Sequence, residues 1–309
     1  MFSLVVPVYR NEENIPALVT ACAGLSKELG GAFEAVFVVD GSPDRSAEAL
    51  ARALESKPFR AQLAVLSRNF GSFAAIRCGL SVARGERFGV MAADLQEPPE
   101  LMLDFARRLE QDACDVVVGT REGRADPLGS RASAGLFWWV YRRLVQPQMP
   151  RGGVDVFACN RLFRDRLLEL PELNSTLVGL LVWMGFRRQE VPYQRRAREA
   201  GVSAWTFRKK LRYLFDSMYA FSDLPFQLLL AFGAGSMALT IGLGAAVLVG
   251  RVAGWITVEG YTPIVLLLLF FGSLHCLSFG VLGGYLFRTF ENTKGRPPFL
   301  VQMQRSYDP

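Results

Sequence analysis

The order of apolar and polar residues divides the chain into two parts. Up to about Ala204, short apolar runs alternate with charged and amphipathic stretches, as in a globular protein. Beyond it, two uncharged apolar runs cover Leu224 to Gly250 and Tyr261 to Phe287. A helix needs roughly 20 apolar residues to cross about 30 Å of hydrocarbon, and both runs exceed that length. The pattern predicts a soluble domain followed by two transmembrane helices, with two buried core helices as the alternative.

Strands and helices alternate through the first part of the chain. Apolar, β-rich runs predict strands at Phe2–Val8, Ala35–Val39, Ala64–Ser67, Phe88–Ala93 and Asp115–Gly119. Helical spacing is found between them at Glu13–Leu29, Ser46–Glu55, Phe73–Ala83 and Pro99–Gln111. Ser46 is expected to cap its helix. This alternation predicts an α/β fold, a mostly parallel sheet flanked by helices on both faces.

Polar motifs follow three of the predicted strands. They are Asp40-Gly41-Ser42, Ser67-Arg68-Asn69 and Asp94-Leu95-Gln96. Ligands of such sheets bind outside the carboxyl ends of the strands, so we expect the three motifs to converge on one rim. A carboxylate such as Asp94 can hold Mg²⁺ or Mn²⁺, hard ions that prefer oxygen ligands. A metal there would neutralise charge on a departing nucleoside diphosphate.

Two amphipathic stretches precede or adjoin the apolar runs. Gly135 to Val145 is rich in aromatic residues, and Phe207 to Phe221 has helical apolar spacing. The apolar face of the second stretch holds Phe207, Leu211, Leu214, Phe215, Met218 and Phe221. Both stretches are predicted to be interfacial helices that lie on a membrane, with ordinary core-packing helices as the alternative.

The net charge of +6 is unevenly distributed. Basic residues gather before the first apolar run, at Arg187, Arg188, Arg195, Arg196, Arg198, Arg208, Lys209, Lys210 and Arg212. Arg288, Lys294 and Arg296 follow the second run, and the loop between the runs holds Arg251 and Glu259. The positive-inside rule therefore places the soluble domain and both termini in the cytoplasm. Anionic lipid headgroups account for the basic stretch better than nucleic acid, so no nucleic-acid partner is expected.

The remaining chemistry-bearing residues point to structural roles. Five cysteines show no metal-binding spacing and are expected to be apolar residues in a reducing compartment. Met1 to Tyr9 is too short, and lacks the basic start, for a signal peptide, and it is expected to be a buried strand. The single histidine, His275, lies in the second apolar run, where we expect a hydrogen bond between helices.

Four motifs together resemble one enzyme family. Val5 to Glu12 resembles the opening strand of family 2 inverting glycosyltransferases with the GT-A fold. Asp40 to Asp44, Ser67 to Gly71 and Ala93 to Glu100 match that family in order and spacing. The segment from Gly185 to Trp205 and the paired apolar tail resemble the polyprenyl-phosphate glycosyltransferases. This subgroup includes dolichol-phosphate mannose synthases, undecaprenyl-phosphate glucosyltransferases and the aminoarabinose transferase.

The resemblance implies a set of site residues. On the donor side, Pro7, Tyr9 and Glu12 would line a nucleotide pocket together with Asp40, and Arg68 would lie near the base or a phosphate. Asp94 and Gln96 would occupy the metal motif. On the acceptor side, Asp155 would be the catalytic base or would orient the acceptor phosphate, and Arg198 and Ser203 would contact donor or lipid phosphate.

Two positions depart from the family's pattern. Val39 stands where the family usually has the first of two adjacent aspartates, so we expect weakened or broadened discrimination of the donor's base. Phe157 stands near Asp155 at a position that is often arginine, which bears on the acceptor contact.

The resemblance and the residue patterns together predict four regions. They are a GT-A catalytic domain (1–204), an interfacial helix (205–223), a two-helix transmembrane domain (224–288) and a cytoplasmic tail (289–309). The implied activity is inverting transfer of a sugar from a nucleotide diphosphate sugar, most simply a UDP-hexose, to polyprenyl (undecaprenyl) phosphate at the cytoplasmic face of a bacterial inner membrane. A GDP-mannose-dependent enzyme is the main alternative, ahead of a processive polysaccharide synthase and a non-catalytic membrane scaffold. A homo-oligomer remains open.

Overall fold

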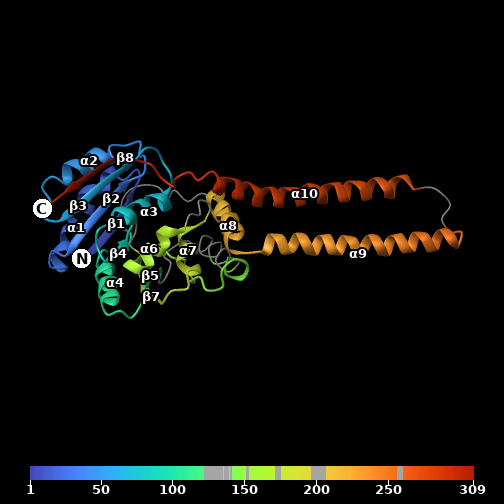
Figure 1. Cartoon of the computed structure of the whole chain (residues 1–309), viewed down its shortest axis with the longest axis horizontal. Coiled ribbons are helices and arrows are strands. Elements are labelled where there is room, and N and C mark those ends of the chain that lie inside the picture. The colour runs from blue at the N-terminus through green and yellow to red at the C-terminus, as the bar shows by residue number, and fades with distance from the viewer. Residues whose placement is uncertain are drawn as a thin grey trace.

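A mixed sheet forms the centre of the N-terminal domain (Figure 1). The computed structural model describes residues 1–121, 135, 139, 141–150, 153–170, 175–195, 207–255 and 260–309. The strands are β1 (Phe2–Val8), β2 (Phe33–Val39), β3 (Arg60–Leu66), β4 (Arg87–Val90), β5 (Val116–Arg121), β6 (Val156–Asn160), β7 (Arg188–Tyr193) and β8 (Val301–Tyr307). Their order is β7-β5-β6-β4-β1-β2-β3-β8. Only the pairings that involve β6 and β8 are antiparallel among the described strands, which confirms the predicted, mostly parallel sheet.

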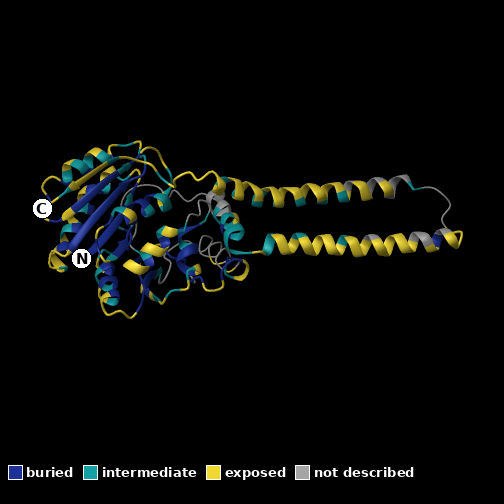
Figure 2. Cartoon of the chain, in the orientation of Figure 1, coloured by how far each residue is buried: buried dark blue, intermediate teal, exposed yellow. Residues whose placement is uncertain are grey.

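Helices cover both faces of this sheet because its strands are apolar on both sides. Along β1, Leu4 and Val6 belong to one core cluster and Val5 belongs to the other. The first cluster is covered by α1 (Ile15–Glu28), α2 (Ser46–Ala53) and α4 (Glu100–Glu110). The second is covered by α3 (Ser72–Val82), α6 (Arg161–Glu169) and α7 (Leu177–Trp183). Figure 2 shows the strands of the sheet buried between these layers.

The start of α2 differs from the expectation. Arg45, not Ser46, is the residue before the helix, and Ser46 is its first residue. The Ser46 Oγ accepts a hydrogen bond from the Asn11 N–H at 3.3 Å, so it ties α2 to the loop after β1. The oxygens that satisfy the free amides of the helix start come from other side chains. Asp44 Oδ1 accepts from the Ser46 N–H at 3.2 Å, and Glu12 Oε2 accepts from the Arg45 N–H at 3.1 Å.

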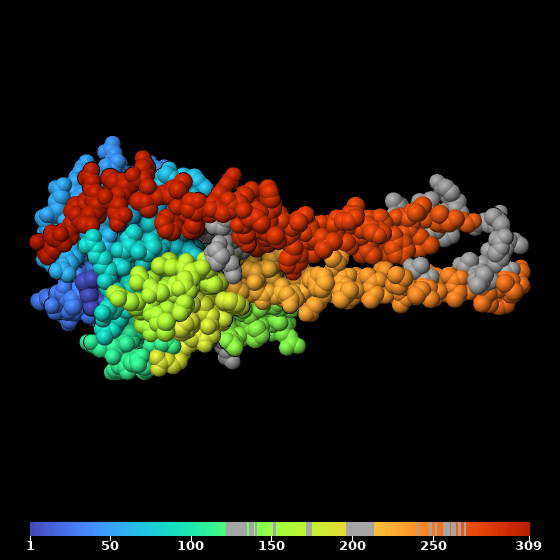
Figure 3. Space-filling model, viewed as in Figure 1, coloured from blue at the N-terminus to red at the C-terminus, as the bar shows by residue number. Residues whose placement is uncertain are grey.

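The end of the chain is not a separate tail, contrary to the expectation for residues 289–309. β8 pairs antiparallel with β3 and forms one edge of the sheet. Met303 and Tyr307 pack against the core while the residues between them are exposed. Such an edge strand presents few apolar residues, which is why the apolar pattern did not predict it. Figure 3 shows this last segment lying over the N-terminal part of the domain.

Two long helices extend away from the domain. They are α9 (Leu224–Val252) and α10 (Tyr261–Thr293), and they contact each other (Figure 1). Leu224–Ala246 and Phe270–Thr293 are long and apolar enough to cross a membrane, and 0% of each stretch is buried within the chain. This exposure excludes the alternative of buried core helices. The His275 Nδ1 forms a hydrogen bond with the Phe271 carbonyl of its own helix at 2.8 Å, whereas the sequence predicted a hydrogen bond between helices.

Helix α8 (Phe207–Phe221) joins the domain to α9 and is a helix as predicted. Part of its apolar face packs inside the protein, however. Leu214, Met218 and Phe221 pack against a cluster that contains Tyr141 and Val182. Phe215 is 49% exposed and remains available to a lipid surface. The expected interfacial helix is therefore in part a packing helix, because the domain itself offers an apolar surface beneath it.

The end of α10 nearest the domain is fastened to α8. The Arg288 guanidinium donates to Asp216 Oδ1 at 2.6 Å. The same guanidinium lies 4.9 Å from the centre of the Tyr219 ring, which packs edge-on against Tyr285. These contacts fix α8 against the end of α10 from which the chain returns to the sheet.

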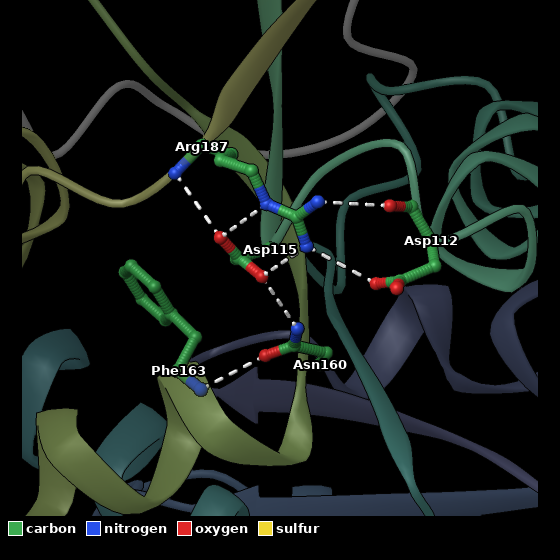
Figure 4. A network of polar contacts seen from close by, with 5 residues as sticks. All are labelled: Asp112, Asp115, Asn160, Phe163 and Arg187. Atoms are coloured by element: carbon green, nitrogen blue, oxygen red, sulfur yellow. Dashed lines mark hydrogen bonds and ion pairs between the residues drawn. The ribbon is translucent and has the colours of Figure 1, made fainter.

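A polar network fixes β5, β6 and β7 at the rim opposite the polar motifs (Figure 4). The Arg187 guanidinium donates to both oxygens of Asp115, at 2.9 and 3.1 Å, and to Asp112. Asn160 donates to Asp115 Oδ1 at 3.0 Å and caps α6 by accepting the Phe163 N–H. The hydrogen bonds from Arg187 lower the pKa of the Asp115 carboxyl. One carboxylate thereby sets the relative position of three strands.

Candidate active site

The loops that carry the polar motifs meet at one rim of the sheet. β1, β2, β3 and β4 are parallel, so their carboxyl ends lie on the same side. β5 and β7 share this direction, and the antiparallel β6 begins at this rim. The strand order reverses between β1 and β4, the position at which open α/β sheets bind ligands. The expected convergence of the three motifs is confirmed.

The loops after β1 and β2 are tied to each other through their own polar groups. The Arg10 N–H donates to Ser42 Oγ at 2.8 Å, and the Glu12 N–H donates to Asp44 Oδ2 at 3.3 Å. Burial raises the pKa of Asp44, but hydrogen bonds from Ser42, Ser46 and the backbone outweigh burial and lower the pKa overall. Glu12, which was expected in the nucleotide pocket, accepts the Arg45 N–H and so supports the start of α2.

Two further residues expected in this pocket, Pro7 and Tyr9, are placed differently from Glu12. Pro7 is half-buried within β1. Tyr9 is 39% exposed just beyond the strand, and the Arg10 guanidinium lies 5.5 Å from the centre of its ring. An exposed aromatic ring at the rim has the shape and polarity to stack on a nucleotide base. That role for Pro7 and Tyr9 stays a prediction.

Asp40 holds the loop of residues 67–71, which we call the donor loop. Its Oδ1 accepts from the Phe70 N–H at 2.7 Å, and its Oδ2 accepts from the Gly71 N–H at 2.8 Å. Burial raises the pKa of Asp40, and this effect exceeds the opposite effects of the two amides and of Arg68. Each carboxylate oxygen already accepts a backbone N–H, so a nucleotide that contacts Asp40 would share these oxygens with the loop.

Gly41 and Arg68 complete this contact between loops. A Cβ on Gly41 would lie 2.2 Å from the Arg68 carbonyl carbon and 2.4 Å from the Asn69 nitrogen, and the φ of Gly41 is +54°. Only glycine fits so close a backbone approach. The exposed Arg68 guanidinium lies 3.9 Å from the centre of the Phe70 ring, at the tip of the donor loop. It stays the predicted phosphate or base contact.

The two departures from the family pattern do not face the rim. Val39 is 1% exposed and packs in the core cluster under α1 and α2. Phe157 is 3% exposed and packs in the cluster on the other face. The expectation that Val39 weakens discrimination of the donor's base stays a prediction, since a valine buried in the core offers the base no hydrogen-bond acceptor.

The Asp94-Leu95-Gln96 motif adopts a strained turn just beyond β4. Leu95 has a φ of +52°, uncommon for a residue with a side chain and typical of functional sites. The turn brings the Gln96 N–H to 3.4 Å from Asp94 Oδ1 and leaves Asp94 half-buried. Gln96 itself is mostly buried.

Glu97 is a site residue that the sequence did not single out. It is 1% exposed, and its Oε1 lies 3.5 Å from the Arg195 Nε. Burial raises the pKa of Glu97 to about 7; Arg195 opposes this, and the charges of Asp94 and Asp155 add to it. Its Oε2 has no hydrogen-bond partner among the described residues. The charges of Asp94 and Asp155 both act on this buried carboxyl, and a common site for the two aspartates stays the prediction.

Asp155 lies directly before β6, near Arg121 at the end of the adjacent β5 and Tyr193 at the end of β7, the next strand along. The Arg121 Nε forms an ion pair with Asp155 Oδ2, and the Tyr193 hydroxyl donates to the same oxygen at 3.2 Å. Burial, followed by the charge of Asp155, raises the pKa of Tyr193. Arg121, which the sequence did not single out, ends β5 two residues beyond the predicted end of that strand. Arg198 and Ser203 lie outside the described residues, just beyond Arg195.

The oxygen ligands at this rim suit a shared divalent ion. No three His, Cys, Asp or Glu side chains of the described chain are close enough to hold a metal by themselves. Mg²⁺, however, is usually bound by one or two carboxylates together with substrate phosphates. Asp94, Gln96 and the unpartnered Oε2 of Glu97 offer oxygens of this kind. The residues present fit Mg²⁺ or Mn²⁺ held jointly with a diphosphate.

Comparison with known proteins gives one consistent result. The model of glycosyl transferase family 2 matches residues 3–170. Glycosyltransferase YkcC of Bacillus subtilis is 30% identical over 97% of this chain and 93% of its own length. The undecaprenyl-phosphate 4-deoxy-4-formamido-L-arabinose transferase of Salmonella paratyphi A is 29% identical over 97% and 92%. Mannosyl-3-phosphoglycerate synthase from Rubrobacter xylanophilus shares the fold, with a TM-score of 0.52, 16% identity and coverage of 70% and 71%.

Proposed function

This chain belongs to glycosyl transferase family 2 and is a transferase, and we propose that it moves a sugar from a nucleotide diphosphate sugar to polyprenyl phosphate. The Salmonella relative is named for transfer to undecaprenyl phosphate, and its similarity to this chain covers 97% of the residues, the apolar helices included. That extent supports an acceptor of the same chemical class here. The proposed donor is a UDP-hexose.

One observation carries the proposal: the rim faces the pair of apolar helices. The donor loop begins at Ser67, whose N–H donates to the Leu300 carbonyl at 2.9 Å. Leu300 lies between the end of α10 and the start of β8. The carboxyl ends of the strands therefore point toward the helices that extend from the domain (Figure 1). An acceptor phosphate at a membrane surface would meet a donor bound at this rim.

The rim residues provide the parts of a displacement reaction. An oxygen of the lipid phosphate attacks the anomeric carbon, the bond to the nucleoside diphosphate breaks, and the configuration inverts. Asp94 and Gln96 are the proposed metal ligands, and a divalent ion there would neutralise charge on the leaving diphosphate. Arg121 would receive the acceptor phosphate, and Asp155 would orient the Arg121 guanidinium and that phosphate. Because a phosphate oxygen is already anionic near pH 7, positioning matters more than proton removal.

We further propose that both helices cross a bacterial inner membrane as a hairpin, with the domain and both termini in the cytoplasm. The pairing of β8 with β3 supports this, because it joins the chain's end to the domain that precedes the first helix. The catalytic domain then comprises residues 1–204 together with β8. Labelling checks the topology in a Cys276→Ser background, since Cys276 is the exposed cysteine in the described chain. Trp255→Cys should react with an impermeant reagent from outside intact cells and Asp308→Cys should not; the opposite pattern would reverse the orientation.

A transfer assay tests the activity. The purified full chain is supplied with Mg²⁺ or Mn²⁺, undecaprenyl phosphate and a panel of labelled UDP-, GDP- and dTDP-sugars. We expect label in the lipid extract with a UDP-hexose. If GDP-mannose is the best donor, the mannosyl alternative replaces the UDP-hexose. If donors are cleaved without lipid labelling, or label appears in a polymer, the acceptor proposal fails.

A further inference from the structure

The chain that returns from α10 contacts the donor loop before it forms β8. We infer that this returning segment, with Phe299 as its anchor, positions the donor loop for nucleotide binding; the inference rests on the proposed function. The returning segment would thereby support the donor site, although it lies far along the sequence from the donor motifs.

Phe299 is the anchoring side chain of the returning segment. It is half-buried, whereas Asn292 to Pro298 and Leu300 are exposed. It packs against the same apolar cluster as Phe70 of the donor loop and Phe73 of the helix after that loop. The adjacent Leu300 carbonyl accepts the Ser67 N–H at 2.9 Å, at the point where the donor loop leaves β3. The backbone bond thus joins the returning segment to the start of the donor loop, and Phe299 anchors that segment on the apolar cluster that Phe70 also contacts.

The pairing of β8 with β3 changes register where the donor loop begins. Ala64 pairs with Gln304 and Val65 with Met303, but Leu66 pairs with Val301, so Gln302 is an extra residue. Such a bulge bends the strand and redirects the residues after it, and bulges are frequent beside active sites. The bulge lies one residue before Ser67, so β8 directs the exit of the chain from β3.

The rest of β8 is fastened along its length. The Lys57 Nζ donates to the Tyr307 carbonyl at 3.2 Å, and Gln304 donates to Gln62 Oε1 at 3.2 Å. The donor loop is thus held from two sides, by Asp40 at Phe70 and Gly71 and by the returning segment at Ser67. A loop that is ordered before its ligand arrives binds more tightly, because less conformational entropy is lost on binding. Loss of the support from the returning segment should therefore weaken nucleotide binding, although this segment need not contact the nucleotide.

The test measures UDP and GDP affinity by calorimetry on the full chain with Mg²⁺. Phe299→Ala should weaken binding of the preferred nucleotide on the order of tenfold, equal to about 1.4 kcal/mol. Phe299→Leu, which keeps an apolar side chain, should restore most of the affinity. Phe290→Ala is the matched control, since Phe290 is 57% exposed on α10 and distant in sequence from the donor loop. It should bind nucleotide like the wild type.

Steady-state kinetics separate positioning from general destabilisation. Positioning predicts that Phe299→Ala raises KM for the sugar donor and leaves KM for undecaprenyl phosphate unchanged. Unchanged nucleotide affinity, equal losses for donor and acceptor, or no rescue by Phe299→Leu would overturn the inference while leaving the proposed function intact. Failure of the wild type to bind either nucleotide would instead overturn the proposed function, and this inference with it.

Discussion

The two halves of the rim are built in different ways. In the donor half, backbone amides bind the carboxylates, as Asp40 shows with Phe70 and Gly71. In the half proposed to bind the acceptor, charged side chains face one another, as Asp155 does with Arg121. Bonds to the backbone fix loops in place before a ligand arrives. Ion pairs between side chains can exchange a protein partner for a phosphate. We therefore propose that the donor half is preformed, whereas the charges of the acceptor half rearrange on binding.

The largest effect is expected at Asp94, where the two halves meet. Asp94→Asn should lower kcat about 10²–10³-fold, the usual loss when one preorganised electrostatic stabiliser of a transition state is removed. The dependence on divalent ion should weaken at the same time. Asp104→Asn, a partly exposed carboxylate on α4, serves as the matched control. A stable Asp94→Asn protein with wild-type turnover would remove Asp94 from the chemistry.

Asp155 sharpens the comparison because it belongs to the acceptor half alone. Asp155→Asn leaves the Arg121 guanidinium without its carboxylate, so the acceptor phosphate would be misplaced. We expect turnover to fall about 10²-fold, with UDP affinity in calorimetry close to that of the wild type. Asp165→Asn on α6 is the control. A parallel loss of turnover and UDP affinity would move Asp155 to the donor half.

Gly41 tests whether the donor half is preformed. Gly41→Ala forces a Cβ to within 2.2 Å of the Arg68 backbone at a φ of +54°. Such strain costs about 1–3 kcal/mol, and we expect UDP binding to weaken about tenfold. Gly24→Ala, on an exposed helical position with nothing within 4 Å of the new Cβ, should leave binding unchanged. Equal UDP affinity in the two variants would argue that the donor loop adjusts freely.

The smallest effect is expected at Asp115, whose polar network at the opposite rim joins β5, β6 and β7. The pKa of Asp115 is lowered in the folded chain, so its stabilisation is present above the unfolded value of 3.8. It is lost as the pH falls through the lower, folded pKa. Asp115→Asn should therefore lower the Tm near pH 7 and make it less sensitive to acid than that of the wild type. Thermal melts from pH 7 down to pH 3 measure this, and parallel curves would contradict it.

The fold was largely predictable because most strands are continuous apolar runs. β1 has the predicted limits, and the sheet's parallel half follows from the alternation of strands and helices. β3 begins at Arg60 rather than Ala64 because a buried polar residue, Gln62, interrupts the apolar run. Gln62 is tolerated there since it donates to Glu34 and to the Val82 carbonyl, each at 2.8 Å. The order of apolar and polar residues along the chain does not predict such hydrogen bonds between distant residues.

The candidate site was predictable in its motifs but not in its contacts. Asp40 and Asp94 were found at the rim, yet the donor loop as the partner of Asp40 emerged only from the structure. Arg121 ends β5, which pairs with β6, and Tyr193 ends β7, which pairs with β5; both come near Asp155 through long-range pairing, so nothing local in the sequence marks them. β8 was not predicted because an edge strand needs only one apolar face, so it contains few apolar residues.

The central claim is that a sugar passes directly from the donor half to a lipid phosphate at the acceptor half. The most direct measurement follows purified full chain, an α-linked UDP-hexose and undecaprenyl phosphate by NMR, and records the anomeric configuration of the product. We predict a β-linked lipid phosphate sugar that forms in step with UDP release and only when the lipid is present. An α-linked product, or free sugar released at the same rate without lipid, would contradict this claim.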